Sequence, residues 1–274
     1  MQPICNLCGQ GIYTILESKG IFKLVKCNYC GLIYVTPFPL KEFIEEYYNF
    51  DYYINLAHQL QKTAKIWQKR LKTIEGFHKK GRLLDVGCGT GDFLFFGMNN
   101  GWKVYGTEIR NEVCNYIKEK RGIEIYNGKL KDANYPEDFF DVITLWHVLE
   151  HMEDPLENLK EVNRILKKDG LLVVAIPNVN SYIYKILYLI SKIKNKPFFL
   201  FGKKGQELHL YHFSPVTIKE ILKKAGFDVF LIRPDIAQIT LLKHIIDKIT
   251  ENIFSPLKLK IALSMQIYAR KIKF

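Results

Sequence analysis

A repeating pattern of short β-rich runs from residue 82 onward constrains the fold most strongly. Polar segments long enough for a helix separate the runs. They are Leu83–Val86, Lys103–Thr107, Ile123–Tyr126, Phe140–Leu145 and Gly170–Ala175. This alternation predicts parallel βαβ units. We therefore expect an α/β fold with a doubly wound, mostly parallel sheet, whose ligand lies beyond the carboxyl ends of the strands.

The loop after the first run indicates the kind of cofactor. Between Asp85 and Asp92, glycines stand at positions 87, 89 and 91, a G-x-G-x-G spacing that differs from the G-x-G-x-x-G of dinucleotide loops. Asp85 and Asp92 would repel a diphosphate and attract an ammonium or sulfonium group. Glu108, at the end of the second run, is placed to accept hydrogen bonds from both hydroxyls of a ribose. The loop therefore favours a cationic cofactor without phosphate, although Glu108 alone would also suit NAD.

These residues resemble the class I S-adenosylmethionine-dependent methyltransferases, a family with a seven-stranded, Rossmann-like fold. The likeness covers about residues 80–235 and includes the glycine loop, the run from Phe140 to Pro155, and Gly170-Leu171-Leu172. It implies S-adenosylmethionine (SAM) as the cofactor. The residues that it implies for cofactor binding are Asp85, Gly87, Cys88, Gly89, Gly91, Glu108, Ile109, Lys129, Leu130, Trp146 and His147. Relatives often carry an acidic residue where this chain has Lys129, so the adenine contact departs from the family pattern.

Four cysteines near the N-terminus form a C-x2-C-x18-C-x2-C pattern. They are Cys5, Cys8, Cys27 and Cys30. This spacing is typical of a four-thiolate zinc site, and a glycine after each pair lets the backbone turn back toward the thiolates. Four protein ligands leave no open coordination position, so the expected zinc is structural. Free or disulfide-bonded cysteines and a rubredoxin-like iron site are the alternatives. The remaining cysteines, Cys88 and Cys114, are expected to pack in the interior.

Histidines and one glutamate are the candidate catalytic residues. Methyl transfer from a sulfonium leaves a neutral thioether, so the enzyme must mainly position a nucleophile and remove its proton. The candidates are His147, Glu150, His151, His209 and His212. His147 and His151 have helical i, i+4 spacing, and both histidine clusters follow strand ends, so we expect them to converge over the cofactor. A packing role is the alternative for each histidine.

A metal is a weaker possibility at the same residues. Some small-RNA and quinone O-methyltransferases bind a divalent metal through an E-x-x-E-H run, which Glu150 and His151 partly match. His147 replaces the first glutamate of that run, so we expect no catalytic metal.

The chain is expected to have three parts. These are a zinc ribbon at 1–36, a helical connector at 37–78 and a SAM-binding methyltransferase domain at 79–274. Within the last part, the apolar and basic segment 181–205 is expected to be a substrate lid, with a membrane-surface helix and a core-facing helix as alternatives. A second insert at 236–254 precedes an expected closing antiparallel strand from Leu263 to Arg270.

Charge and hydropathy limit the partners and the compartment. The chain has 40 Lys and Arg against 28 Asp and Glu, and the last ninety residues alone carry a net charge of +11. This suits an anionic partner, although lysine-rich solvated helices would give the same count. No stretch of about 18 unbroken apolar residues is present, and no charged segment precedes an apolar one at the N-terminus. We expect a cytoplasmic protein, with transient contact to a membrane surface as an option.

A narrower resemblance indicates the acceptor. Methyltransferases of surface-polysaccharide and sugar pathways also carry an N-terminal four-cysteine module, and this chain shares Pro177-Asn178 and the run His209 to Pro215 with them. The resemblance implies methylation of a hydroxyl on a sugar or glycoconjugate. The alternatives are C-methylation of a nucleotide-linked keto sugar, methylation of an RNA base, and a non-catalytic binding module. Nucleic acid is disfavoured because the ribbon has only three lysines and the chain lacks an Asn-Pro-Pro-Tyr run.

Overall fold

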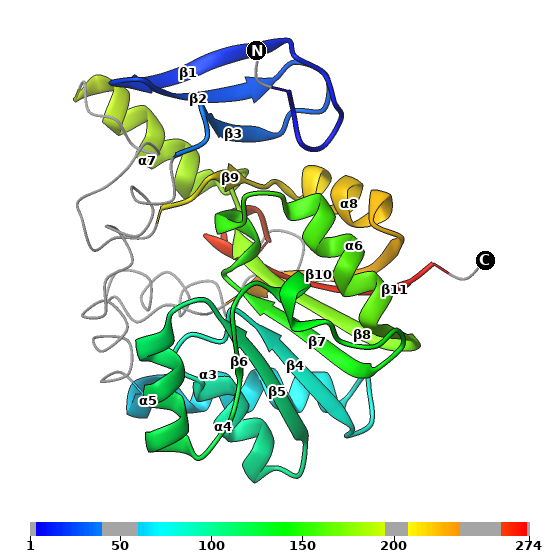
Figure 1. Ribbon diagram of the computed structural model, residues 1–274. Helices are drawn as coiled ribbons and strands as arrows, with labels where there is room; N and C mark the ends of the chain where they lie inside the picture. The colour runs from blue at the N-terminus through cyan, green and yellow to red at the C-terminus, as the bar shows by residue number, and fades with distance from the viewer. Residues whose placement is uncertain (1–3, 40–59, 195–207, 236–258, 273–274) are drawn as a thin grey trace.

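A seven-stranded sheet forms the centre of the protein (Figure 1). The computed structural model describes residues 4–39, 60–194, 208–235 and 259–272. The strands are β4 (Arg82–Val86), β5 (Lys103–Glu108), β6 (Tyr126–Asn127), β7 (Phe140–Trp146), β8 (Leu166–Pro177), β10 (Phe227–Asp235) and β11 (Ser264–Lys271). Their order is β10-β11-β8-β7-β4-β5-β6. Strands β4 to β8 pair in parallel, and β11 pairs antiparallel with both β8 and β10. The expected α/β sheet and its closing antiparallel strand are confirmed.

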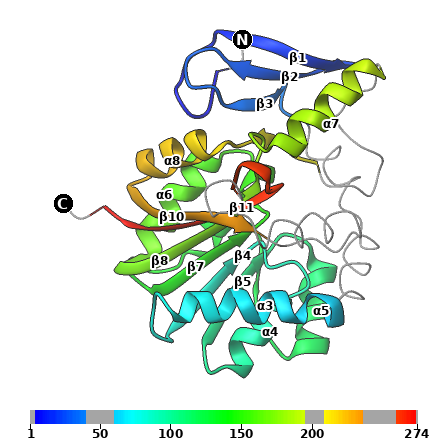
Figure 2. The same ribbon diagram turned by 180° about the vertical axis from the view of Figure 1, so that it is seen from behind.

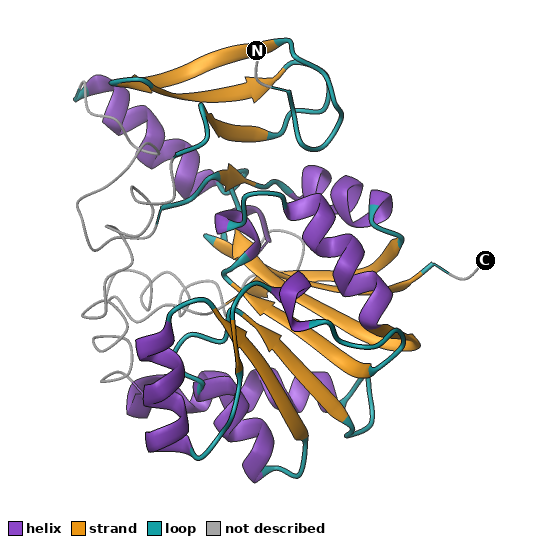
Figure 3. Ribbon diagram, viewed as in Figure 1, coloured by secondary structure: helices purple, strands orange, loops and turns teal. Residues whose placement is uncertain are grey.

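Helices cover both faces of this sheet (Figure 3). They are α3 (Leu60–Glu75), α4 (Asp92–Asn99), α5 (Asn111–Arg121), α6 (Pro155–Ile165) and α8 (Pro215–Lys224). Successive residues of a strand therefore enter different cores: Leu84 packs in one hydrophobic cluster and its neighbour Leu83 in the other, and both are fully buried. Burial on both faces explains why these strands are continuous apolar runs rather than alternating ones.

The strand expected at Ile123–Tyr126 is wrong in its extent. Only Tyr126 and Asn127 pair with β5, opposite Thr107 and Glu108. Gly122 ends α5 in the left-handed region, with φ of 66°. The next residue, Ile123, is buried outside the sheet. The apolar run therefore reflects packing in a connection rather than an edge strand.

A second, smaller sheet joins segments that are far apart in the sequence. It contains β1 (Tyr13–Lys19), β2 (Phe22–Cys27), β3 (Ile33–Thr36) and β9 (Tyr211–His212), in the order β1-β2-β3-β9. The pairing of β3 with β9 is antiparallel and places Ile33 opposite His212. Figures 1 and 2 show β1, β2 and β3 on one side of the large sheet, with β9, the fourth strand of the small sheet, nearest to the large one. The N-terminal module is therefore paired directly with the segment that carries two of the candidate histidines.

Helix α7 (Tyr182–Ile193) lies beside the small sheet, and Lys192 Nζ donates a hydrogen bond to the carbonyl of Leu16 at 2.8 Å (Figure 1). Its apolar residues Ile186, Leu189 and Ile193 are exposed. A core-facing helix here is therefore wrong. None of the helices in the described ranges has the length and apolar character needed to cross a bilayer.

Parts of three expected segments lie outside the described residues. These are residues 40–59 of the connector, residues 195–205 of the expected lid and the whole insert 236–254.

Candidate functional site

The glycine-rich loop joins β4 to α4 at the carboxyl edge of the large sheet. Gly87, Gly89 and Gly91 have φ of 64°, 52° and 71°, a region that favours glycine. A Cβ atom on Gly87 would lie 2.8 Å from the side chain of Val148, and one on Gly91 would lie 3.0 Å from Ile117. At Gly89 nothing lies within 4 Å of that position. The outer two glycines therefore permit close packing, whereas the middle one faces open space.

Glu108 ends β5 beside the glycine-rich loop, and its carboxylate links the end of this strand to the loop. Oε2 accepts a hydrogen bond from the backbone N–H of Gly89 at 3.2 Å. Oε1 accepts from the N–H groups of Ile109 at 2.9 Å and Arg110 at 3.2 Å. Burial raises the pKa of Glu108, while these three N–H groups oppose the rise. The expected ribose-binding carboxylate is thus held next to the glycine loop.

The segment after β6 also contacts Glu108. The N–H of Gly128 donates to the carbonyl of Glu108 at 2.9 Å. Leu130 is buried, but Lys129 is exposed and its Nζ lies 3.6 Å from Glu153 Oε2. Of the two residues expected near an adenine, only Leu130 is packed inside.

The two aspartates that flank the loop are in different environments. Asp85 is buried and accepts a hydrogen bond from Thr144 Oγ1 at 2.7 Å, and burial raises the pKa of Asp85 to about 7. Asp92 accepts from Arg121 Nη2 at 2.5 Å. Burial raises the pKa of Asp92 to about 6, although Arg121 opposes the rise. Because Arg121 already pairs with Asp92, the expected attraction of a cation by that carboxylate is weakened.

Trp146 belongs to an aromatic wall next to the loop. Its ring lies 5.2 Å from the ring of Phe93 and 5.9 Å from that of Trp67, measured between centroids. The guanidinium of Arg70 stacks 4.3 Å from the centroid of the Trp146 ring. Such a cation–π contact in a buried position stabilises the pair by roughly 2 kcal/mol. These ring contacts hold the guanidinium of Arg70 in position to pair with Asp235.

A buried network of charged and polar side chains joins α3, β10 and β11, which no sequence pattern had linked. Asp235, at the end of β10, accepts from Arg70 Nη2 at 2.6 Å and from Gln266 Nε2 at 2.5 Å. Its Oδ2 also lies 3.2 Å from His147 Nε2. The side chains of Arg70 and Asp235 are only 4% and 1% exposed. No motif marked Arg70, Asp235 or Gln266, because each comes from a different element and gains meaning only through the fold.

His147 is held as a cation by this network. It has a φ of 55°, and its Nδ1 lies 3.5 Å from Glu150 Oε1 while Nε2 faces Asp235. Burial alone would lower the pKa of His147, but these two carboxylates outweigh it and raise the pKa to about 9. An imidazolium keeps its proton at neutral pH and is a poor general base. The expected helical spacing of His147 and His151 is also wrong, because only the short 3-10 turn Leu149–His151 forms here.

The other three candidate histidines lie close to one another. The rings of His151 and His209 lie 4.9 Å apart, and those of His209 and His212 lie 6.0 Å apart. The N–H of Leu210 donates to the carbonyl of Glu150 at 2.9 Å and holds the two segments together. Burial, with the neighbouring His209 and His151, lowers the pKa of His212 to about 3, so His212 is neutral.

The four N-terminal cysteines also gather at one point. The Sγ atoms of Cys5 and Cys30 lie 3.5 Å apart, those of Cys8 and Cys27 lie 3.4 Å apart, and all four lie within 4.8 Å of one another. Each pair sits in a turn closed by a glycine N–H, from Gly9 to the Cys5 carbonyl and from Gly31 to that of Cys27. The other two cysteines, Cys88 and Cys114, are buried in the large domain.

Comparisons with known proteins agree with this architecture. Residues 56–231 match a family described as a methyltransferase domain. An uncharacterized protein of Methanocaldococcus jannaschii is 31% identical over 163 residues, which are 59% of this chain and 72% of that protein. A demethylmenaquinone methyltransferase of Staphylococcus aureus is 27% identical over 179 residues, or 60% of this chain and 74% of that enzyme.

Solved structures share the fold. A SAM-dependent methyltransferase from Archaeoglobus fulgidus has a TM-score of 0.54 and 19% identity, covering 81% of this chain and all of the other. One from Mesorhizobium loti has a TM-score of 0.50 and 17% identity, covering 70% and 92%. Because the family match covers more than half of the chain, this protein belongs to the methyltransferase-domain family and is a SAM-dependent methyltransferase.

Proposed function

We propose that this enzyme transfers the methyl group of SAM to a hydroxyl of a sugar or glycoconjugate. The convergence of three histidines and Glu150 next to the end of β7 carries the proposal. An imidazole there can accept the proton of a hydroxyl as it attacks. The sugar acceptor is supported by the resemblance of the ribbon and the His209 to Pro215 run to sugar-pathway enzymes.

The loop between β4 and α4 is the proposed cofactor site. The open space at Gly89 leaves room for the cofactor, and the Glu108 carboxylate beside it would hold the ribose hydroxyls. Asp85, Gly87, Cys88, Gly91, Ile109, Leu130 and Trp146 would line the site, with Lys129 at its rim. Bound SAM supplies an electrophilic methyl group on a sulfonium. His147 would carry positive charge rather than remove a proton, so His151 and His209 are the better candidates for the base.

The cysteine cluster is proposed to hold a structural zinc ion. Four thiolates within 4.8 Å of one another fit a tetrahedral ion with no open position. Such an ion would fix β2 and β3, and β3 in turn pairs with β9. The proposed ribbon at 1–36 would therefore also help position His209 and His212.

The acceptor can be identified by methyl transfer from radiolabelled SAM to a panel of compounds. Nucleotide-linked sugars come first, and tRNA and demethylmenaquinone are added, the latter because a relative acts on it. Labelled sugar formed by the wild type but not by Glu108→Ala would support the proposal. Label appearing only in tRNA or only in demethylmenaquinone would overturn the sugar assignment.

A further inference from the structure

Helix α7 presents its apolar side to the outside of the protein. Five exposed apolar residues recur at the spacing of one helix face, namely Tyr182, Ile186, Leu189, Ile190 and Ile193. Among them, Ile186, Leu189 and Ile193 are 59%, 64% and 81% exposed. Ser191, on the opposite face of the helix, is buried instead. A helix on a globular protein normally turns its apolar stripe toward the core, so we expect another apolar surface to cover this one.

Lysines flank the apolar stripe of α7 on both sides. At about 100° of rotation per residue, Lys185 and Lys192 lie along one edge of the stripe, and Lys194, at the C-cap, lies at the other. All three lysines are exposed. The sequence from 182 to 194 contains no Asp or Glu. An apolar stripe with basic edges is complementary to the acyl boundary and the anionic headgroups of a phospholipid surface.

Two hydrogen bonds hold α7 in this orientation. At its start, Ser181 Oγ donates to the carbonyl of Ile261 at 2.7 Å. Near its end, Lys192 Nζ donates to the carbonyl of Leu16 at 2.8 Å and places the helix beside the hairpin of β1 and β2 (Figures 1 and 2). The turn of that hairpin adds another apolar side chain, Ile21, which is 72% exposed. Because the helix is attached at both ends, its apolar stripe is a fixed feature of the surface.

We propose that α7 lies flat on the surface of an anionic phospholipid bilayer, with its apolar stripe at the boundary between headgroups and acyl chains. Lys185 and Lys194, at the two edges of the stripe, would extend their ammonium groups to the lipid phosphates. A second copy of this chain fits the face less well. It would bring lysines against lysines, and the chain already carries a net charge of +12.

The position of α7 connects this surface to the histidines of the candidate site. The helix follows the carboxyl end of β8 in the chain, and the N–H of Val179, between the two, donates to the carbonyl of Phe213 at 3.1 Å. Phe213 directly follows His212. A bilayer under α7 would therefore present its headgroups near these histidines. Membrane binding does not depend on the proposed function, but one consequence rests on it: the acceptor would be a glycoconjugate with a lipid anchor.

Vesicle flotation of the full-length protein, without SAM or acceptor, tests the inference. Vesicles of phosphatidylcholine alone are compared with vesicles that also contain phosphatidylglycerol, which is anionic. We expect the protein to float with the anionic vesicles and to stay behind with the neutral ones. Leu189→Gln should weaken binding at least about tenfold, because one apolar side chain is lost from the buried stripe. Lys185→Gln should weaken it by about fivefold, the contribution of one lysine at an anionic surface.

Matched controls come from α8. Val216 is 62% exposed there, close to the 64% of Leu189, and Lys219 is also exposed, so Val216→Gln and Lys219→Gln should float like the wild type.

Three results would overturn the inference. They are no flotation with anionic vesicles, equal flotation with neutral and anionic vesicles, and equal weakening by Leu189→Gln and Val216→Gln. Sedimentation velocity adds a fourth: a dimer that Leu189→Gln dissociates, in a protein that binds no vesicles, would assign the face to a second copy. Because neither SAM nor acceptor is present in flotation, failure of the methyltransferase proposal would instead appear in cofactor binding or methyl transfer.

Discussion

Replacing Asp235 by asparagine tests the buried charge network. The substitution removes the negative charge that Arg70 Nη2 contacts at 2.6 Å and that lies 3.2 Å from His147 Nε2. Both partners would then be buried cations without this counter-charge. Removal of one partner from a buried ion pair costs about 3–5 kcal/mol. We expect Asp235→Asn to lower the free energy of unfolding by that amount, which corresponds to a fall in Tm of about 10 °C.

Urea denaturation at pH 7, followed by tryptophan fluorescence, gives the free energy of unfolding directly. The matched control is Asp228→Asn, because Asp228 lies on the same strand but is exposed. An exposed charge of this kind should change stability by at most about 0.5 kcal/mol. If Asp235→Asn cost no more than Asp228→Asn, the reasoning about the network would be refuted.

Three further predictions concern separate parts of the molecule. The pKa of His147 rises to about 9 in the folded state from 6.5, so the stability that its charge contributes is full below pH 6.5 and is lost as pH rises through 9. The difference in unfolding free energy between wild type and His147→Gln should therefore shrink between pH 6.5 and 9.5. A difference that stays constant over this range would contradict the prediction. Gly89→Ala should fold but bind SAM at least about tenfold more weakly in calorimetry, whereas Gly101→Ala, which has a similar positive φ and open surroundings, should bind normally. Cys8→Ser should lose the zinc measured by mass spectrometry, and equal zinc content in Cys8→Ser and Cys114→Ser would rule out the cysteine site.

The sequence predicted the features that depend on local pattern. The β-rich runs and the glycine loop indicate the large sheet and its carboxyl edge, because each is short and contiguous. A closing antiparallel strand was also expected at Leu263–Arg270, one residue before the observed β11, but its place between β8 and β10 was not. The four cysteines were predicted to gather because two turns in one small module bring them together.

Features that depend on contacts between distant segments were not predicted. Asp235 and Arg70 are separated by 165 positions, and nothing in either local sequence indicates a partner. The two-residue strand β9 is too short to leave a pattern, yet it connects the cysteine module to the histidines. The charge state of His147 depends on Asp235, so its spacing to His151 was a poor guide to its role.

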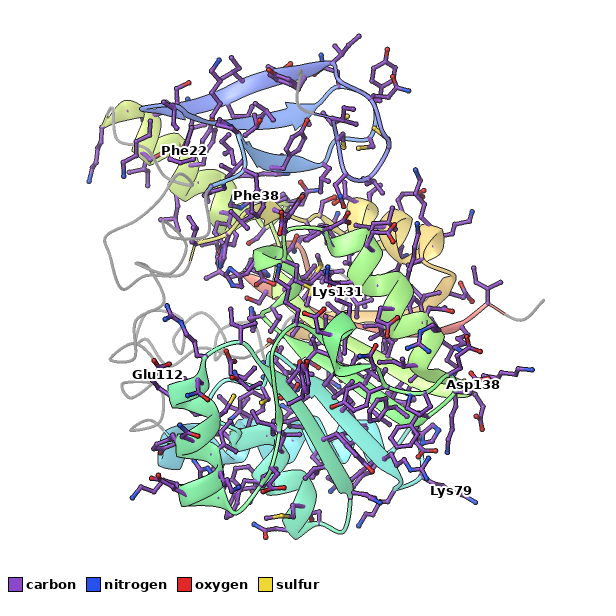
Figure 4. The ribbon with its side chains drawn as sticks, in the orientation of Figure 1. Phe22, Phe38, Lys79, Glu112, Lys131 and Asp138 are labelled. Carbon is purple, nitrogen blue, oxygen red and sulfur yellow. The ribbon has the colours of Figure 1, made fainter. Side chains whose placement is uncertain are left out.

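Calorimetric titration with SAM tests the central claim most directly. Wild type is compared with Glu108→Gln and with Glu112→Gln, a control on the first turn of α5 that lies at the surface (Figure 4). We predict that wild type and Glu112→Gln bind SAM and not NADH. Glu108→Gln should lose at least about tenfold in affinity, since hydrogen bonds to a charged group contribute roughly 1.5–3 kcal/mol. Unchanged SAM affinity in Glu108→Gln, or binding of NADH in place of SAM, would contradict the account.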